Sequence, residues 1–359
     1  MLFVSASRPQ IKALPHALRP SAAPVLIKRP FTGNRQASLS VAVSAGYNML
    51  TAKQKEQFEA DGTLRWGHFS SLGNSKLSPV SPYTETVGYL VLENFTPVAQ
   101  LAEMRRQAVA LVADFDPETI SVFSTKNQTK TSNDYFSESA NNVSFFFEEN
   151  AFNEEGQLRQ PKALSINKMG HAMHDLDPVF VRWSRSAQVA ELLQDLGYKK
   201  PTPVQSMYIF KQPNIGGEVV PHQDSTFLYT DPLSVIGFWM ALEDSTKENG
   251  CLWSLPGSHK AGVRRKMTVK DGKTTFDPPT PEEFDLEQFT PLEMKAGSMV
   301  ILHGNNIHFS KENTSSKSRH AYSVHYVEGT EDHSWPEGNW LHRRSDFPFK
   351  PLTQGTTVA

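Results

Sequence analysis

The amino-acid sequence predicts an α+β fold in which helices come first and an antiparallel β-core, a sandwich or jelly roll, follows. Helical periodicity is confined to the chain before Gly197. Beyond it stand short apolar or alternating runs punctuated by Gly, Pro and Asn, such as "SVIGFWMALED", "GSMVILHG" and "RHAYSVHYVE". Strands at this density, without helices between them, favour antiparallel sheets over a doubly wound sheet. No internal repeat, GxGxxG or P-loop motif is present, so helices and strands are expected to form one unit.

A strand between two helices is expected near the start of the ordered chain. Thr51 and Gln54 have the spacing of a capping box, which predicts a short helix over 51–61. The run "GYLVLENF" predicts a strand, and Pro97 opens the helix that follows it. The apolar face of that helix is expected to carry residues at helical spacing, namely Leu101, Met104, Ala108 and Leu111.

Three further stretches precede the β-core. Residues 115–140 are polar and are expected to form a mobile loop. The run "VSFFFEE", with Phe145–Phe147, predicts a buried strand or turn. Residues 169–196 have a helical pattern in two pieces, broken at Pro178 and ended by Gly197.

The first 48 residues differ in composition from the rest of the chain. Six of the 36 Lys and Arg residues lie in 1–48, whereas the first acidic residue is Glu56. A basic, acid-free segment containing Ser is typical of an organelle transit peptide, so we expect a leader to a mitochondrial or other organelle matrix. The alternative is a disordered leader or an overextended start, because Met49 opens a second beginning. The protein would then be cytoplasmic.

The composition excludes several classes of protein. The formal net charge is -2 over 359 residues, which leaves no global basic field for nucleic acid. No apolar run approaches the about 20 residues that cross a bilayer. The single cysteine, Cys251, rules out a disulfide framework and fits a reducing compartment. Residues 49–359 are expected to form one catalytic domain, with a Ser-, Gly- and Pro-rich segment at 63–87.

A metal site is indicated by the stretch "VVPHQDSTF". On a strand, His222 and Asp224 point to the same side. One imidazole and one carboxylate suit ferrous iron held by two histidines and a carboxylate, an arrangement that leaves three positions open. The second histidine would come from a later strand, where "VILHGNNIHFS" offers His303 and His308. Arg319 follows a polar turn, and its planar guanidinium can hold a carboxylate through two hydrogen bonds.

These motifs, in this order, resemble the phytanoyl-CoA dioxygenase family of iron(II)/2-oxoglutarate oxygenases. The pattern consists of His222-Gln-Asp224, then "NGCLWSLPGSH", then His308 followed by Arg319. The runs "SINKMGHAMH" and "VQSMYIFKQPNIGGEVVPHQDSTFLYT" resemble the phytanoyl-CoA dioxygenase domain-containing protein 1 subgroup. Family members usually continue from "DG" directly into the strand that "GYLVLENF" matches. Segment 63–87 is therefore interpreted as an insertion or a gene-model artefact.

The resemblance implies a double-stranded β-helix, or jelly roll, core flanked by N-terminal helices. It also implies that His222, Asp224 and His308 bind Fe(2+). His308 is preferred over His303 because it alone keeps the family's eleven-residue step to Arg319. Arg319 itself is expected to clamp the distal carboxylate of 2-oxoglutarate.

The same resemblance places Lys168, Met207 and Trp239 around the co-substrate. Lys168 offers a second positive charge, while the other two supply apolar walls. The implied activity is hydroxylation of a small or lipid-like organic substrate with O2, releasing succinate and CO2, with ascorbate as a candidate reductant. The alternative is a protein that binds iron and 2-oxoglutarate as a sensor without catalysis. Acyl-CoA is not assumed as the substrate, and the sequence gives no oligomeric state.

Other conspicuous residues are interpreted as structural. His171 and His174 are expected at a helix start with polar contacts, and His259 at a turn bonded to the backbone. The Phe145–Phe147 run is expected in the core. The basic run at 263–266 is interpreted as a solvated turn, with recognition of an anionic substrate as the alternative.

Overall fold

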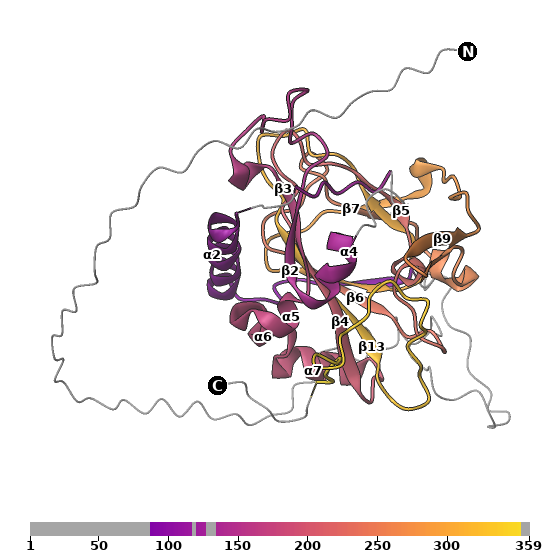
Figure 1. Ribbon diagram of the computed structural model, residues 1–359. Coiled ribbons are helices and arrows are strands. Elements are labelled where there is room, and N and C mark those ends of the chain that lie inside the picture. The colour runs from indigo at the N-terminus through magenta and orange to yellow at the C-terminus, as the bar shows by residue number, and fades with distance from the viewer. Residues whose placement is uncertain (1–86, 117–119, 127–133, 353–359) are drawn as a thin grey trace, which may run out of the picture. The chain divides into compact units, whose positions relative to one another are not determined.

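The computed structural model of the chain describes residues 87–116, 120–126 and 134–352 (Figure 1). The leader expected over 1–48, the helix expected over 51–61 and all but the last residue of the expected insertion lie outside this part. Within the described residues, no helix combines the length and the apolar character that crossing a bilayer demands.

The centre of the fold is a seven-stranded sheet in which all neighbouring strands are antiparallel. In spatial order its strands are β1 (Tyr89–Leu92), β11 (Met299–His303), β6 (Ile236–Ala241), β13 (Ala321–Glu328), β4 (Pro201–Ile209), β3 (Ile166–His171) and β2 (Val143–Phe147). The order along the sheet is far from the order along the chain. Residues distant in sequence are therefore placed side by side on each face.

A smaller antiparallel sheet faces the first and completes the jelly roll. Its strands, in order, are β10 (Thr290–Leu292), β7 (Leu252–Ser254), β12 (His308–Ser310) and β5 (Val219–His222). Apolar side chains of the two sheets pack together, with Trp239 and Leu302 from the large sheet against Leu252 and Leu292 from the small one. A separate hairpin consists of β8 (Lys266–Lys270) and β9 (Lys273–Asp277). The predicted α+β class and jelly-roll core are confirmed.

Four helices cover the large sheet on the face away from the small sheet (Figure 1). They are α2 (Val98–Asp114), α5 (Met173–Leu176), α6 (Pro178–Ser184) and α7 (Ala187–Asp195). The alternation of β13 shows how the sheet separates core from site. Tyr322, Val324 and Tyr326 lie in the core cluster with the helices, whereas Ser323 and His325 point to the opposite face and line a cavity.

The helix expected after Pro97 is present, but its last buried position differs from the prediction. Leu101, Met104 and Ala108 are buried, followed by Val112 rather than Leu111. Both positions fit helical spacing from Ala108, so only packing against the sheet decides which of them is covered. Leu111 is partly buried at the edge of the same cluster.

The helical pattern predicted from residue 169 is wrong at its start. Ile166–His171 form β3, inserted between β4 and β2, and a helix begins only at Met173. A short apolar run does not distinguish a buried strand from a buried helix, and here the neighbouring strands decide. The predicted break at Pro178 is confirmed, since Pro178 begins α6 and Asp177 caps it by accepting bonds from the backbone N–H groups of Val179 and Phe180.

The predicted Phe145–Phe147 strand is confirmed as β2, whose three rings are buried. Within the stretch expected as a loop over 115–140, Val122 bridges to Phe147 and α4 (Asp134–Glu138) forms a short helix. Single-turn 3-10 helices occupy Ser139–Asn141, Lys162–Leu164, Asp224–Thr226, Ser258–Ala261 and Leu286–Gln288.

Candidate active site

Two histidines and an aspartate converge where β5 meets β12. His222, the last residue of β5, pairs directly with His308, the first residue of β12, and their ring centroids are 4.3 Å apart. Asp224 Oδ1 lies 3.8 Å from Nε2 of His222 and 3.7 Å from Nε2 of His308. One ligand atom from each residue lies within 4.8 Å of the other two, which is close enough to hold one metal ion.

The sequence argument for this convergence was only partly right. His222 and Asp224 do not share a strand, because β5 ends at His222 and Asp224 begins a 3-10 turn. Gln223 between them keeps extended dihedral angles and points elsewhere, donating to the carbonyls of Gly262 and Asn305 at 2.8 and 2.7 Å. The turn, held by these bonds, therefore brings the carboxylate back beside the imidazole.

Both histidines hold the tautomer that a metal ligand requires. Nδ1 of His222 lies 2.9 Å from the carbonyl oxygen of Val220, and Nδ1 of His308 lies 3.1 Å from that of Asn306. A carbonyl only accepts, so each Nδ1 carries a proton, and Nε2 is the nitrogen that each ring turns towards Asp224. Burial, followed by the neighbouring His308, lowers the pKa of His222 to about 4, so this imidazole is neutral at pH 7.

The aspartate has the complementary protonation state. Burial alone would raise the pKa of Asp224, but the histidines around it, His325 first, hold it below its ordinary value. The group is therefore an ionised carboxylate. Two imidazoles and one carboxylate, grouped on one side of a cavity, are a donor set that suits ferrous iron.

The second oxygen of Asp224 faces two residues that the sequence analysis missed. Asp224 Oδ2 lies 3.2 Å from Nε2 of His325 on β13. A Cβ atom added to Gly237 on β6 would lie only 2.9 Å from the same oxygen. His325 alternates with Ser323 on the face of β13 opposite the core, so the strand expected from "RHAYSVHYVE" could have indicated it through this alternation. Nothing in the sequence pattern indicates Gly237.

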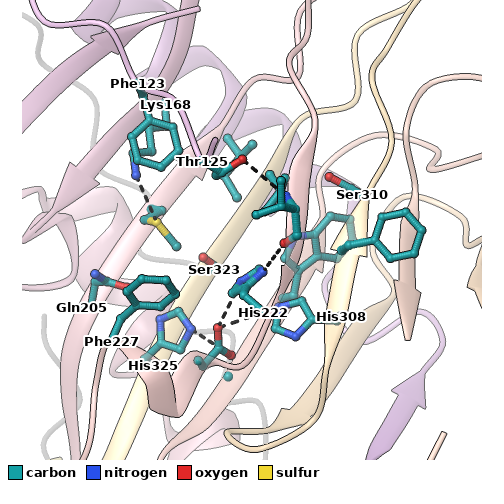
Figure 2. A pocket seen from close by; sticks show the side chains of 18 of the residues that line it. Phe123, Thr125, Lys168, Gln205, His222, Phe227, His308, Ser310, Ser323 and His325 are labelled. Atoms are coloured by element: carbon teal, nitrogen blue, oxygen red, sulfur yellow. Dashed lines mark hydrogen bonds and ion pairs between the residues drawn. The ribbon is translucent and has the colours of Figure 1, made fainter. Parts of the chain in front are cut away.

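His222, Asp224 and His308 lie at one end of a cavity of about 180 Å³ between the two sheets. Figure 2 shows His222, His308 and His325 converging at this end, with Lys168 and Phe123 at the other. The residues expected around the co-substrate all line the same cavity, namely Lys168, Met207, Trp239 and Arg319. His303 does not line it. It packs beside His259, with ring centroids 5.2 Å apart.

Arg319 is a buried cation whose guanidinium is incompletely bonded. It is 1% exposed, donates from Nε to the carbonyl of Gly250 at 3.1 Å and lies over the Trp239 ring at 5.1 Å. Among the described residues, its Nη1 has no hydrogen-bond partner. Burial lowers the pKa of Arg319 to about 10, so it remains charged at neutral pH. Such a group calls for an anion in the cavity.

Lys168 is a second buried cation without an acidic partner in the described part of the chain. Its Nζ lies 3.3 Å from the ring centroid of Phe123 and 3.9 Å from the sulfur of Met207. Burial lowers the pKa of Lys168 to about 7. Trp239 packs between the two sheets and also lines the cavity.

Other candidates from the sequence have structural partners. His171 is the last residue of β3, so the helix start expected at this residue is wrong. Its Nδ1 lies 2.7 Å from Ser139 Oγ. His174 lies at the start of α5 and contacts Ser206. In the run 263–266, Arg264 forms an ion pair with Glu282.

The family model described as phytanoyl-CoA dioxygenase matches residues 84–321. Phytanoyl-CoA dioxygenase 1 of Oryza sativa subsp. japonica is 54% identical over 265 residues, covering 74% of this chain and 92% of the relative. Phytanoyl-CoA dioxygenase domain-containing protein 1 of Rattus norvegicus is 43% identical over 275 residues, covering 74% and 94%.

Solved structures show the same fold at low sequence identity. The iron-bound structure of EctD from S. alaskensis has a TM-score of 0.51 and 20% identity, covering 79% of this chain and 90% of that one. The epimerase SnoN, in complex with Fe3+, alpha ketoglutarate and nogalamycin RO, has a TM-score of 0.50 and 16% identity, covering 75% and 92%. The resemblance inferred from the motifs is thus confirmed. The chain belongs to the phytanoyl-CoA dioxygenase family and is a 2-oxoglutarate-dependent dioxygenase.

Proposed function

We propose that this dioxygenase hydroxylates a small or lipid-like organic substrate and converts 2-oxoglutarate to succinate and CO2. In this proposal His222, Asp224 and His308 hold Fe(2+), and Arg319 clamps the distal carboxylate of 2-oxoglutarate. The observation that carries the proposal is the placement of this donor set and an incompletely bonded buried arginine in one cavity.

Each residue has a definite task in this proposal. Bound iron(II) supplies the redox chemistry that couples dioxygen to the oxidation of both substrates. Burial keeps the imidazole of His222 neutral at pH 7, and the surrounding histidines keep the carboxylate of Asp224 ionised, so these two groups are in the protonation states in which they can bind a metal. His325 faces the second carboxylate oxygen and holds Asp224 in place.

The co-substrate would extend from the donor set towards Arg319. An arginine fork holds a carboxylate through two parallel charge-assisted bonds, and the buried setting strengthens them. Lys168 adds a positive charge on the same cavity, while Met207 and Trp239 exclude water along the carbon chain. The remaining lining is mostly apolar and includes Phe136, Phe227, Leu228, Met267 and Trp340. This lining supports a small or lipid-like substrate.

Succinate release tests the activity directly. Purified protein supplied with Fe(II), ascorbate and 2-oxoglutarate is expected to form succinate slowly even without the primary substrate. Comparative metabolite profiling of an extract, incubated with and without 2-oxoglutarate, is expected to reveal a product heavier by one oxygen atom. The opposing function is a sensor that binds 2-oxoglutarate and iron without turnover. Tight 2-oxoglutarate binding with no succinate and no oxygenated product would favour the sensor.

A further inference from the structure

We propose that Lys211 is a positioning residue of the 2-oxoglutarate site, which orients the hydroxyl of Ser310 towards the distal carboxylate and adds a positive charge beside Arg319. The proposal rests on the proposed function, in which Arg319 holds that carboxylate. Neither Lys211 nor Ser310 was indicated by the sequence motifs, yet both line the same cavity as Arg319.

Lys211 is held in the protein interior by specific contacts. It follows β4, is 2% exposed, and has a φ of 42°, a left-handed conformation that is uncommon for a residue with a Cβ atom. Its Nζ donates to the carbonyl of Gly217 at 2.6 Å and to Ser310 Oγ at 2.9 Å. Lysine is rarely buried to this extent without a charged partner.

The backbone at Gly250 contacts both Lys211 and Arg319. A Cβ atom added to Gly250 would lie 2.7 Å from Cε of Lys211, so the stem of the lysine needs a glycine at this position. The carbonyl of Gly250 accepts the bond from Nε of Arg319. The backbone N–H of Arg319 in turn donates to the carbonyl of Lys211 at 3.3 Å. Lys211 and Arg319 are thus fixed relative to each other by one backbone framework.

The bond between Lys211 and Ser310 has a direction. In its ammonium form Lys211 has three donors and no acceptor, so Ser310 Oγ accepts from it. The hydroxyl proton of Ser310 therefore points away from Lys211 and is available to a group in the cavity. Together with the unpartnered Nη1 of Arg319, it presents donors only. Such a pair fits an acceptor with several lone pairs, as a carboxylate is, and rejects a donor.

The surroundings of Lys211 and Arg319 contain little negative charge. The only acidic side chain bonded to this framework in the described chain is Glu148, which is fully buried. Its Oε2 accepts from Asn167 at 2.7 Å and from the N–H of Gly217 at 3.0 Å. Burial raises the pKa of Glu148, so this carboxylate does not fully offset the charges of Lys211 and Arg319. A co-substrate carboxylate would complete the balance, and burying an uncompensated charge is costly without it.

The lysine's protonation responds to that carboxylate. Burial, followed by the nearby Arg319, lowers the pKa of Lys211 well below its ordinary value, whereas Glu148 opposes the shift. An added negative charge beside Arg319 favours the ammonium form. Co-substrate binding therefore strengthens the state of Lys211 that orients Ser310.

The opposing interpretation is that Lys211 only fastens the segment at Gly217 to β12. The two interpretations differ in how they depend on the distal carboxylate. We would titrate 2-oxoglutarate and 2-oxopentanoate, which lacks that carboxylate, into Mn(II)-loaded protein by calorimetry. Lys211→Met is expected to weaken 2-oxoglutarate binding by about tenfold or more, as expected for losing a bond to a charged group, and 2-oxopentanoate binding by less than about twofold. An equal loss for both acids would overturn the proposal.

Ser310→Ala keeps the test decisive if Lys211→Met fails to fold, because it removes one oxygen and leaves the lysine in place. It is expected to reduce the preference for 2-oxoglutarate over 2-oxopentanoate by about fivefold. If it leaves that preference unchanged, the orientation of Ser310 plays no part and the proposal fails. Where both variants fold, the double variant is expected to lose less than the product of the two single losses, because both act through one hydroxyl.

Arg319→Met separates this proposal from the one on which it rests. It is expected to abolish the preference for 2-oxoglutarate altogether. A preserved preference in Arg319→Met would reject the proposed function itself. A preference that is lost in Arg319→Met but unchanged in Lys211→Met and Ser310→Ala would reject only the role of Lys211.

Discussion

His222 and His308 face each other as direct partners across the β5–β12 pair, with ring centroids 4.3 Å apart. Backbone pairing sets this separation, and the Nδ1 bonds to neighbouring carbonyls set the ring orientations. The two Nε2 atoms are therefore directed at one point by the sheet itself. A site built on strands in this way holds its geometry more firmly than one built on loops.

The choice between His303 and His308 is testable with a matched pair of variants. His308→Ala is expected to abolish the visible charge-transfer band that iron(II) and 2-oxoglutarate form in the absence of oxygen, because one of three protein ligands is lost. His303→Ala is expected to retain the band, since His303 lies outside the cavity and packs beside His259. His222→Ala should behave as His308→Ala does. A band that disappears only in His303→Ala would show that the wrong histidine has been assigned.

Gly237→Ala is expected to weaken metal binding by about tenfold to a hundredfold, the range found when a group beside a metal ligand is disturbed. The added Cβ would approach Asp224 Oδ2 to 2.9 Å and displace the carboxylate from its position between the two histidines. The measurement is a competition titration of Co(II) or Fe(II) against a chromophoric chelator.

Ser323→Ala on the neighbouring strand is the control, because it lines the same cavity but removes an atom instead of adding one. Its metal affinity should match that of the unmodified protein. Unchanged metal binding in a folded Gly237→Ala protein would mean that Asp224 does not need its observed position.

Lys168 is expected to make 2-oxoglutarate binding depend on pH. Burial lowers the pKa of Lys168 to about 7, so the ammonium form predominates below this pH and the neutral amine above it. The KM for 2-oxoglutarate is therefore expected to rise as the pH increases from about 6 to about 8. Lys168→Met should have a high KM throughout and lose this part of the pH dependence.

The matched control is Arg264→Met, which removes a cation that is ion-paired with Glu282 and does not line the inner cavity. It should keep the pH dependence of the unmodified protein. The assay is initial-rate succinate formation at several pH values. A Lys168→Met protein whose KM changes with pH as steeply as before would exclude Lys168 as the titrating group.

A buried ion cluster is expected to stabilise the fold away from the active site. Asp175 accepts bonds from Arg185 and, at 2.9 Å, from Arg343, and its side chain is 3% exposed. Asp175→Asn would leave both arginines without a counter-charge and is expected to reduce the free energy of unfolding by about 3 kcal/mol. Asp346→Asn is the control, because its partner Arg344 is exposed and the change should stay below about 0.5 kcal/mol.

The same cluster predicts a dependence of stability on pH. Burial alone would raise the pKa of Asp175, but His174 and Arg185 hold it below its ordinary value. A depressed pKa means that the contribution is complete above the unfolded-state value of about 4 and is lost as the pH falls below it. Urea unfolding at pH 7 and near pH 3, inside the range where the contribution is lost, should show a smaller acid-induced loss in Asp175→Asn. Equal losses in both proteins would contradict the assignment.

Local chemistry was enough to predict several elements. Pro97 before an apolar stripe gave the start of α2, and Pro178 gave the start of α6. The density of short strands after Gly197 predicted the jelly roll. The residue types His, Asp and Arg, in a family-like order, indicated the site residues now found in one cavity. Each of these inferences depends on neighbours in sequence or on an ordered motif.

The predictions that failed depended on contacts between distant strands. Ile166–His171 form a strand because β4 and β2 pair with them on either side. The apolar pattern of these six residues does not predict that pairing. The sequence by itself determined which residue types carry the chemistry. Only the tertiary structure decided that His325 and Gly237 shape Asp224 and that Lys211 reaches Ser310, because antiparallel pairing brings together side chains that the chain separates widely.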